Sequence, residues 1–409
     1  MAINKIQLEQ DGLVVGNNQL TASGGGVYIG KSLSVANVIA VGNTTINTTA
    51  ISANVISVGN TSVRAFVNSS IISVSDSVGN TTFINSVAVS VSGNSITPYQ
   101  GMRNRLINGG MDIWQRGTSF SLPSGGVSSA NNYTADRWIC YSGGSSPGHT
   151  VTRTTDVPSS DFLYSLKNQR NSGNTSTGSI YSVQFVESVN CYDLSNSLCT
   201  LSFWAECGST YSGANNALNV VVGTGTTADQ GYSTLAGAGW AGYATPLNVN
   251  ATLATNWRKY TYTFMVGSGT REMFVMFNNP TSGTAGADDS YSIAGVQLEK
   301  GPVATPFEKR LYTTELALCQ RYYQTIPTGG IFVSSYGGGG VTSAHTLSFP
   351  ITMRTAPTIT SPSFSYTGFG TSAALYTLTA QTGYVSWGQS SAGNGSATST
   401  SPALLSAEL

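Results

Sequence analysis

Carboxylates are the residues of this sequence best suited to proton-transfer chemistry, and fourteen of the eighteen lie between residues 101 and 315. Glycoside hydrolysis needs two carboxylates roughly 5–9 Å apart across one sugar bond. No motif fixes such a spacing here. Adjacent carboxylates point to opposite sides of a strand, so they are more typical of a turn, or less often of a calcium site. The candidate pairs are Asp112 with Asp136, Asp288 with Asp289, and Glu187 with Glu206.

Nucleophilic and metal chemistry have weaker support. The sequence has no GxSxG motif, and its two histidines, His149 and His345, lie in different predicted domains, which disfavours a Ser-His-Asp arrangement. An odd number of cysteines without CxxC spacing argues against both a disulfide framework and a zinc site. We therefore predict no catalytic residue, no metal, no cofactor, and buried apolar thiols at Cys140, Cys191, Cys199, Cys207 and Cys319.

Glycan binding needs no titratable group, because aromatic rings can stack on sugars while hydroxyl and amide groups contact the sugar hydroxyls. After Arg321 only Arg354 and Glu408 carry charge, whereas aromatic residues and hydroxyls are frequent. Several aromatics there adjoin glycines, which allow close approach of a ligand and make poor core positions. The alternative is that these aromatics form the core of the C-terminal unit. The tentative glycan-binding residues are Tyr336, Phe369, Tyr384 and Trp387.

Composition limits the class of protein. Only 9% of the 409 residues are charged, far below the ~25% of typical globular domains. Zero net charge and no basic run longer than two residues argue against nucleic-acid binding. The sequence has no run of 18 apolar residues and no apolar signal core at its N-terminus, so we expect neither membrane insertion nor export. Low charge with abundant β-branched and turn-forming residues predicts an all-β protein.

A degenerate repeat fills residues 33–100. The segments "VANVIAVGNTTI" and "SANVISVGNTSV" match at a shift of 17 residues, and glycine–asparagine turn marks recur at Gly42, Gly59, Gly79 and Gly93. Between these marks apolar and small polar residues alternate as in strands. One copy offers too few apolar side chains to offset about 1–2 kcal/mol of entropy per ordered residue. We expect a stalk in which several chains intertwine, or, less favoured, a single-chain solenoid. Asp76 is expected near a turn.

Residues 101–312 read as a different unit, a jelly-roll of two packed antiparallel sheets. Its expected strands include "YSVQFVESV", "LCTLSFWAEC", "ALNVVVG", "WRKYTYTFMV", "REMFVMFN" and "YSIAGVQLE". A helix over Thr313–Gln324, with Thr313 as its N-cap, links this unit to a C-terminal β domain at 326–409. Strands expected in that domain are "GIFVSS", "HTLSFPITM", "TITSPSFSY", "LYTLTA" and "YVSW".

Four segments occur in a recognisable order: "NRLINGGMDIWQRGTSF", "YTADRW", "VQLEKGPVATPFEKR" and "ELALCQRYYQ". This ordered set resembles the carbohydrate-binding-module-like jelly-roll of bacteriophage tail fibres and receptor-binding proteins, over Asn104–Gln324. From the residues themselves, Trp114 and Trp138 are expected to anchor the sandwich, with Asp112, Arg116, Asp136 and Arg137 paired around them. In "VQLEKG", Glu299 and Lys300 are expected at the exposed end of the closing strand.

The resemblance implies a phage structural protein, usually a homotrimer, located in the virion tail and assembled in the host cytoplasm. Residues 1–32 would then attach it to a tail or baseplate protein, and residues 326–409 would form the tip that meets a host surface polysaccharide. The expected function is non-enzymatic adhesion to a bacterial glycan. The alternatives are a polysaccharide-degrading, tailspike-like enzyme and a purely structural virion fibre or adaptor. Release of reducing sugar would identify the enzyme.

Overall fold

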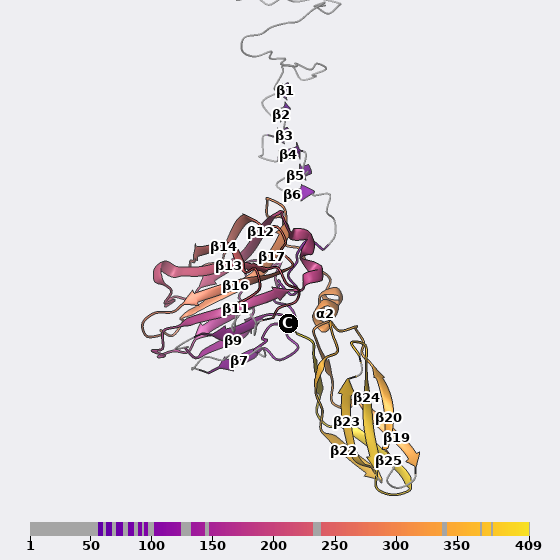
Figure 1. Cartoon of the computed structure of the whole chain (residues 1–409). Helices are drawn as coiled ribbons and strands as arrows, with labels where there is room; N and C mark the ends of the chain where they lie inside the picture. The colour runs from indigo at the N-terminus through magenta and orange to yellow at the C-terminus, as the bar shows by residue number, and fades with distance from the viewer. Residues whose placement is uncertain are drawn as a thin grey trace, which may run out of the picture. The chain divides into compact units, whose positions relative to one another are not determined.

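The protein is described by a computed structural model that covers residues 102–123, 132–143, 147–231, 239–337, 342–368, 370–377 and 379–408, and short strands between Ile56 and Ile96. The chain divides into two units, Met1–Pro98 and Tyr99–Leu409, and each is described by itself. Figure 1 shows the chain with its strands labelled. No helix among the described residues is long and apolar enough to cross a bilayer.

The first unit contains one antiparallel sheet in which each strand pairs with the next along the chain. Two of the glycine–asparagine turns predicted from the sequence lie at or near strand ends. Strand β1 ends at Gly59, and β4 begins two residues after Gly79. Asp76 is the last residue of β3, at a strand end. Intertwining of several chains stays a prediction, and residues 1–32 lie outside the described residues. The strands are β1 Ile56–Gly59, β2 Val63–Val67, β3 Ile71–Asp76, β4 Thr81–Asn85, β5 Val89–Val91 and β6 Asn94–Ile96.

The second unit begins with the predicted sandwich of two antiparallel sheets. One has the order β15-β12-β17-β10-β9-β7 and the other β14-β13-β16-β11-β8. Six of these strands coincide with the expected segments, and the expected "LCTLSFWAEC" is β12 itself. The strands are β7 Ser119–Leu122, β8 Ile139–Ser142, β9 His149–Thr154, β10 Ser165–Arg170, β11 Ser179–Val186, β12 Leu198–Cys207, β13 Ala217–Gly225, β14 Ala244–Thr252, β15 Arg258–Met265, β16 Glu272–Pro280 and β17 Ser290–Lys300; short 3-10 turns lie at Ser188–Asn190, Tyr192–Leu194 and Ala214–Asn216.

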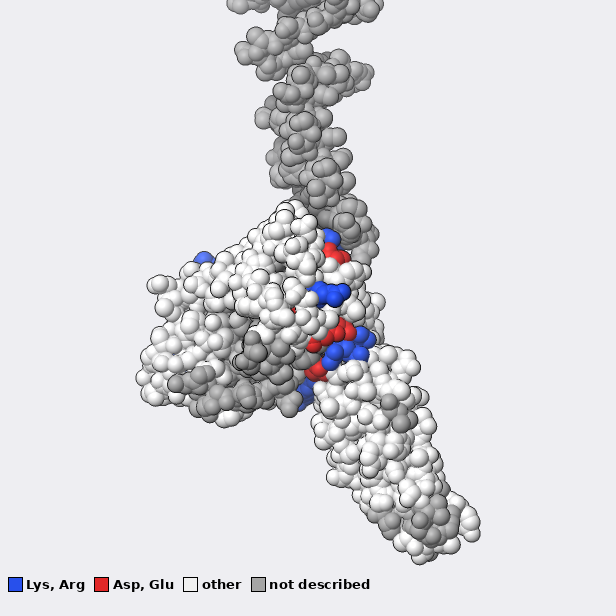
Figure 2. Space-filling model, viewed as in Figure 1, with Lys and Arg blue, Asp and Glu red and all other residues white. Residues whose placement is uncertain are grey.

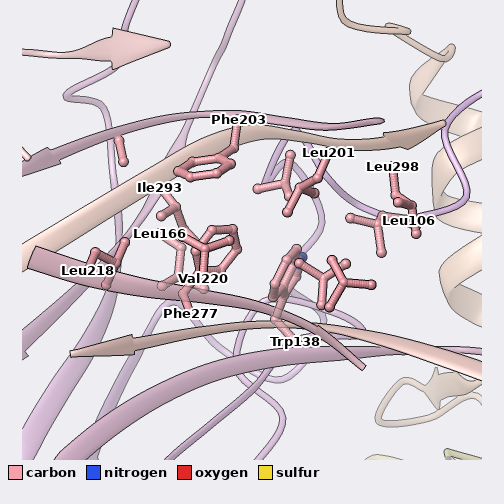
Figure 3. Packing of buried hydrophobic residues seen from close by; sticks show 14 of the residues in the cluster. Leu106, Trp138, Leu166, Leu201, Phe203, Leu218, Val220, Phe277, Ile293 and Leu298 are labelled. Carbon is pink, nitrogen blue, oxygen red and sulfur yellow. The ribbon is translucent and has the colours of Figure 1, made fainter. Parts of the chain in front are cut away.

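Alternate side chains of both sheets fill the sandwich core (Figure 3). Trp138 is fully buried there, and its ring lies 6.1 Å from that of Phe277. Phe203 meets Phe277 edge to face at 4.9 Å. All five cysteines are buried free thiols, as predicted. The prediction that Glu299 lies at an exposed strand end was wrong, since Glu299 is buried. Hydrogen bonds from the backbone N–H and the hydroxyl of Thr305 to its carboxylate compensate for the lost solvent.

The helix between the two β domains is shorter than predicted. Helix α2 spans Tyr312–Gln320, with Leu311 rather than Thr313 at its N-cap position. It ends early because Tyr323 and Gln324 enter strand β18 (Tyr323–Ile326), where they pair with Ser406 and Leu405. Pairing with a strand some eighty residues later therefore overrides the local helical pattern.

The C-terminal β domain consists of three three-stranded antiparallel sheets with the orders β18-β26-β21, β19-β25-β22 and β20-β24-β23. Its apolar core is separate from that of the sandwich and includes Val333, Leu375, Val385, Trp387 and Ala397. Strands β25 and β26 were not predicted: β25 has only small and polar residues, which carry little apolar signal, and β26 is only four residues long. Besides β18, the strands are β19 Phe332–Gly337, β20 Thr342–Ser348, β21 Thr358–Thr360, β22 Phe364–Gly368, β23 Gly370–Thr377, β24 Thr382–Gln389, β25 Gly393–Ser399 and β26 Ala403–Ser406.

Candidate functional site

One outward sheet face of the C-terminal domain combines exposed aromatic rings with hydroxyl and amide groups. On β19 the exposed residues alternate with the buried Val333: Phe332 is 62% exposed and Tyr336 79% exposed. Strand pairing places Thr398, Ser396 and Asn394 of β25 beside them, and Ser365 and Thr367 of β22 beyond. We call this surface the Tyr336 face. Its members are Phe332, Ser334, Tyr336, Ser365, Thr367, Asn394, Ser396 and Thr398.

A hollow of about 470 Å³ lies on the Tyr336 face. Its lining comes from all three strands of the sheet: Ser334 and Tyr336, Thr367 and Gly368, and the run Asn394–Ser396. Every one of these side chains is uncharged, and the Thr367 and Ser396 hydroxyls are hydrogen-bonded to each other. The hollow can therefore present hydrogen-bonding groups and one aromatic ring to a ligand without involving a charge.

Gly368 is required at the edge of this hollow for two reasons. Its φ of +63° lies in the left-handed region, which residues with a Cβ rarely adopt. A Cβ at this position would also come within 2.2 Å of the Asn394 carbonyl oxygen. The glycine thus allows β22 and β25 to approach closely where the hollow forms.

The predicted residue Tyr384 lies on a different surface. It faces outward from the sheet β20-β24-β23, in a row with Thr346 and Tyr376. The rings of Tyr384 and Tyr376 stack at 5.1 Å, and Tyr376 is 47% exposed. Tyr336 and Tyr384 therefore belong to two separate sheets and do not form one site.

We predicted that Trp387 is exposed because it stands beside a glycine, and this prediction is wrong. It is only 1% exposed and belongs to the core of the C-terminal domain. Its ring fills the space above Gly370, where an added Cβ would come within 2.7 Å of it. Gly370 of the adjacent strand β23 makes room for the buried indole, so the core alternative that we considered holds for this residue. Phe369 lies outside the described residues.

Sequence reasoning missed the rest of the Tyr336 face. Phe332 and Ser334 lie in the predicted "GIFVSS" strand, where alternate residues point outward. Asn394, Ser396 and Thr398 belong to the unpredicted strand β25. A signal was nevertheless available, because small and polar residues alternate in "GNGSATS". Such alternation is typical of a strand with one buried and one exposed face.

The candidate catalytic carboxylates are engaged with separate partners. Glu187 accepts hydrogen bonds from Arg321 at 2.7 Å and from the Tyr322 hydroxyl at 2.8 Å. Asp289 forms a fully buried ion pair with Arg170, and Asp288 pairs with Lys167 at 2.9 Å. Burial raises the pKa of both Asp112 and Asp136, and Asp136 also accepts a hydrogen bond from the Gln115 backbone at 2.9 Å and pairs with Arg116. Within the described residues no group of acidic, histidine and cysteine side chains is arranged to hold a metal.

Glu206 has a second acid, Asp156, beside it. Partial burial, and then the neighbouring Asp156, raise its pKa to about 7. Asp156 also accepts a hydrogen bond from the Trp257 indole at 3.1 Å. The histidines do not assist either acid: His149 is buried, which lowers its pKa to about 4, and His345 is half-buried on β20.

The recognised motifs build a junction between the sandwich and the C-terminal domain. Arg116 and Arg137, from the first and second motifs, both form ion pairs with Glu408. Their guanidinium groups also lie over the rings of Tyr323 and Tyr322, at 3.5 and 3.6 Å. These two tyrosines come from the fourth motif. The structural role expected for the charged residues around Trp114 and Trp138 is thus observed for Arg116, Asp136 and Arg137.

The remaining charged residue of the C-terminal domain also serves this junction. Arg354 donates hydrogen bonds to the backbone oxygens of Ala407 and Glu408, at 2.8 and 2.9 Å. Its backbone N–H in turn donates to the Arg321 carbonyl at 2.7 Å. On the face shown in Figure 2, the described surface of the C-terminal domain is white. The blue and red atoms lie on the sandwich and where the C-terminal domain meets it.

Comparisons with known proteins give structural neighbours but no relatives by sequence. No family model and no curated protein matches the chain. A tailspike protein 4 domain of bacteriophage CBA120, described as enzymatically active, shares 17% identity at a TM-score of 0.29, over 40% of this chain. The chain spans about a fifth of that structure.

Two carbohydrate-binding modules are also similar. A CBM4 structure shares 15% identity at a TM-score of 0.28, covering 47% of this chain and 98% of its own. The CBM22-1 xylan-binding domain from Paenibacillus barcinonensis shares 15% identity at a TM-score of 0.26, covering 46% of this chain and 98% of its own.

Proposed function

We propose that the protein is a receptor-binding protein of a bacteriophage tail fibre, which adheres to a bacterial surface glycan without cleaving it. The observation that carries this proposal is the Tyr336 face, which combines the exposed rings of Phe332 and Tyr336 with an uncharged hollow lined by hydroxyl and amide groups. A sugar presents apolar C–H faces and a rim of hydroxyls. Aromatic rings can cover the first, and serine, threonine and asparagine can bind the second.

The phage assignment rests on the ordered motifs and on their resemblance to tail-fibre jelly-rolls. The contacts of these motifs are consistent with that assignment, because Arg116 and Arg137 pair with Glu408 of the C-terminal domain. A receptor-binding tip must transmit adhesion to the rest of a fibre, and these ion pairs connect the C-terminal domain to the sandwich.

We further propose that the fibre is a parallel homotrimer whose residues 1–32 attach to a tail or baseplate protein. Three chains would bury together the small apolar side chains that alternate along residues 33–98. Light scattering on the full chain tests this assembly. A particle of three chains supports it, and a folded particle of one chain, 42.5 kDa, contradicts it.

Binding to an array of purified bacterial surface polysaccharides tests the proposed function. The full chain is compared with Tyr336→Ala and with Tyr192→Ala, which removes another exposed tyrosine, 67% exposed, from the sandwich surface. We expect binding by the full chain, a loss of at least tenfold for Tyr336→Ala, and no change for Tyr192→Ala. Release of reducing sugar from a bound polysaccharide would instead identify an enzyme, and binding to no polysaccharide would contradict adhesion to a glycan.

A further inference from the structure

The charge of the ligand can be inferred from the C-terminal domain, and this inference rests on the proposed function. A binding site for acidic sugars or phosphates needs cationic groups or a cluster of free N–H donors to compensate the buried anion. The domain has one lysine or arginine after residue 326, Arg354, and its guanidinium is occupied by the Ala407 and Glu408 carbonyls at the junction. No cation is therefore available to the hollow from this domain.

Negative charge is equally absent from the Tyr336 face. Glu408 is the only carboxylate side chain after residue 326, and it pairs with Arg116 and Arg137 of the sandwich. The domain's histidine, His345, belongs to β20 in the other sheet. A cationic amino-sugar would find no counter-ion in the hollow either, so the chemistry of the face matches an uncharged ligand.

The length of the ligand follows from the strand geometry. Phe332 and Tyr336 lie on the same side of β19, four residues apart, which is roughly 13 Å along an extended strand. Ser334 lies between them and pairs with Ser396 of β25, while Asn394 of β25 pairs with Tyr336. The two rings thus bracket a polar strip that is long enough for a short run of sugar rings, with stacking at both ends and hydrogen bonding in the middle.

We infer that the Tyr336 face binds a neutral oligosaccharide segment inside a longer polysaccharide, and that it selects against acidic polymers. Selection arises because a carboxylate or phosphate placed in the hollow would lose its hydration without gaining a cation. Binding is then independent of ionic strength, since no charged group of the ligand or the face is involved.

A matched pair of polymers tests this inference. An acidic capsular polysaccharide and its carboxyl-reduced form share one backbone and differ only in charge, and a panel of such pairs is assayed with the full chain at 50 and 500 mM NaCl. We expect binding among the reduced or naturally neutral members, at least tenfold weaker binding to the acidic partner, and less than a twofold change with salt. Preference for the acidic form, or tenfold weakening by salt, overturns the inference while leaving glycan adhesion intact.

A variant with an added charge keeps the test specific to this face. Ser334→Lys places a cation between Phe332 and Tyr336, and Ser348→Lys places one at an exposed position of β20 as the control. We expect Ser334→Lys alone to gain at least threefold in binding to the acidic partner. Equal effects of the two variants would overturn the assignment to the Tyr336 face. Absence of binding to every polymer would overturn the proposed function, and the inference with it.

Discussion

The sandwich and the C-terminal domain use opposite chemistry to reach a stable β structure. The sandwich contains most of the charged residues and buries several of them in pairs, such as Arg170 with Asp289. The C-terminal domain has only Arg354 and Glu408, and both are used at its junction with the sandwich. What remains on the outer faces of the C-terminal domain is uncharged and rich in hydroxyls. The difference indicates that the charged residues stabilise the sandwich and connect it to the C-terminal domain. The uncharged outer faces of the C-terminal domain remain accessible to a ligand.

The largest expected effect is on the core of the C-terminal domain. Trp387→Ala removes a fully buried indole and should cost about 3–5 kcal/mol of unfolding free energy. Tyr336→Ala should change the unfolding free energy by less than about 0.5 kcal/mol, because surface substitutions rarely do more. Chemical denaturation followed by far-UV circular dichroism measures both, because Trp387 is the only tryptophan after residue 326 and its loss removes the fluorescent probe of this domain. Equal stability of the two variants would remove the distinction between core and surface aromatics.

The next effect concerns the junction. Arg137→Met should destabilise the protein by about 3 kcal/mol, the lower end of the range for breaking a buried pair, because Arg116 still binds Glu408 at 3.0 Å. The control is Arg105→Met, which removes a partly exposed pair with Asp193 and should cost less than about 1 kcal/mol. Calorimetry of the two variants checks the prediction. If Arg137→Met costs no more than the control, the charged motif residues do not secure the junction.

A smaller effect depends on pH and is confined to the sandwich. Glu272 is 1% exposed, and burial, with a further contribution from Asp229, raises the pKa of its carboxyl from 4.5 to about 7. Between these values the folded chain keeps a proton that the unfolded chain has lost, so stability falls as the pH rises through this window. Glu272→Gln should remove this loss and raise the stability at pH 8 by on the order of 2 kcal/mol.

The pH test requires two measurements of the same variant. Thermal unfolding at pH 4.5 should differ little between Glu272→Gln and the parent chain, because there the folded carboxyl is protonated and the unfolded one is about half protonated. At pH 8 the variant should unfold at the higher temperature. A variant that is equally destabilised at both pH values would contradict the proton linkage and would indicate a contact of Glu272 that does not depend on pH.

The sequence predicted the sandwich better than the C-terminal domain for a physical reason. Strands such as β12 and β17 carry large apolar residues at alternate positions, so both their type and their limits can be read from the sequence. Strand β25 is built from glycine, serine, threonine, asparagine and alanine, and its pairing is fixed only by β19 and β22 on either side. The end of α2 likewise depends on β26, which lies some eighty residues away.

The candidate site was predicted in part for the same reason. Charge depletion identified the C-terminal domain, and Tyr336 is exposed as expected. Sequence could not separate Tyr336 from Trp387, because both adjoin glycines. The Trp387 indole enters the core above Gly370 of the adjacent strand, whereas the Tyr336 ring stays in solvent. Only the strand register distinguishes the two cases.

Hydrogen exchange of the full chain, with and without a polysaccharide that it binds, tests the central claim most directly. Strands β19 and β22 are the edges of their sheet, so their outer amides exchange readily and can gain protection from a ligand. The account predicts that the added protection is confined to β19, β25 and β22. Protection on the sandwich sheet β14-β13-β16-β11-β8, with none on these three strands, would contradict it and assign glycan binding to the sandwich.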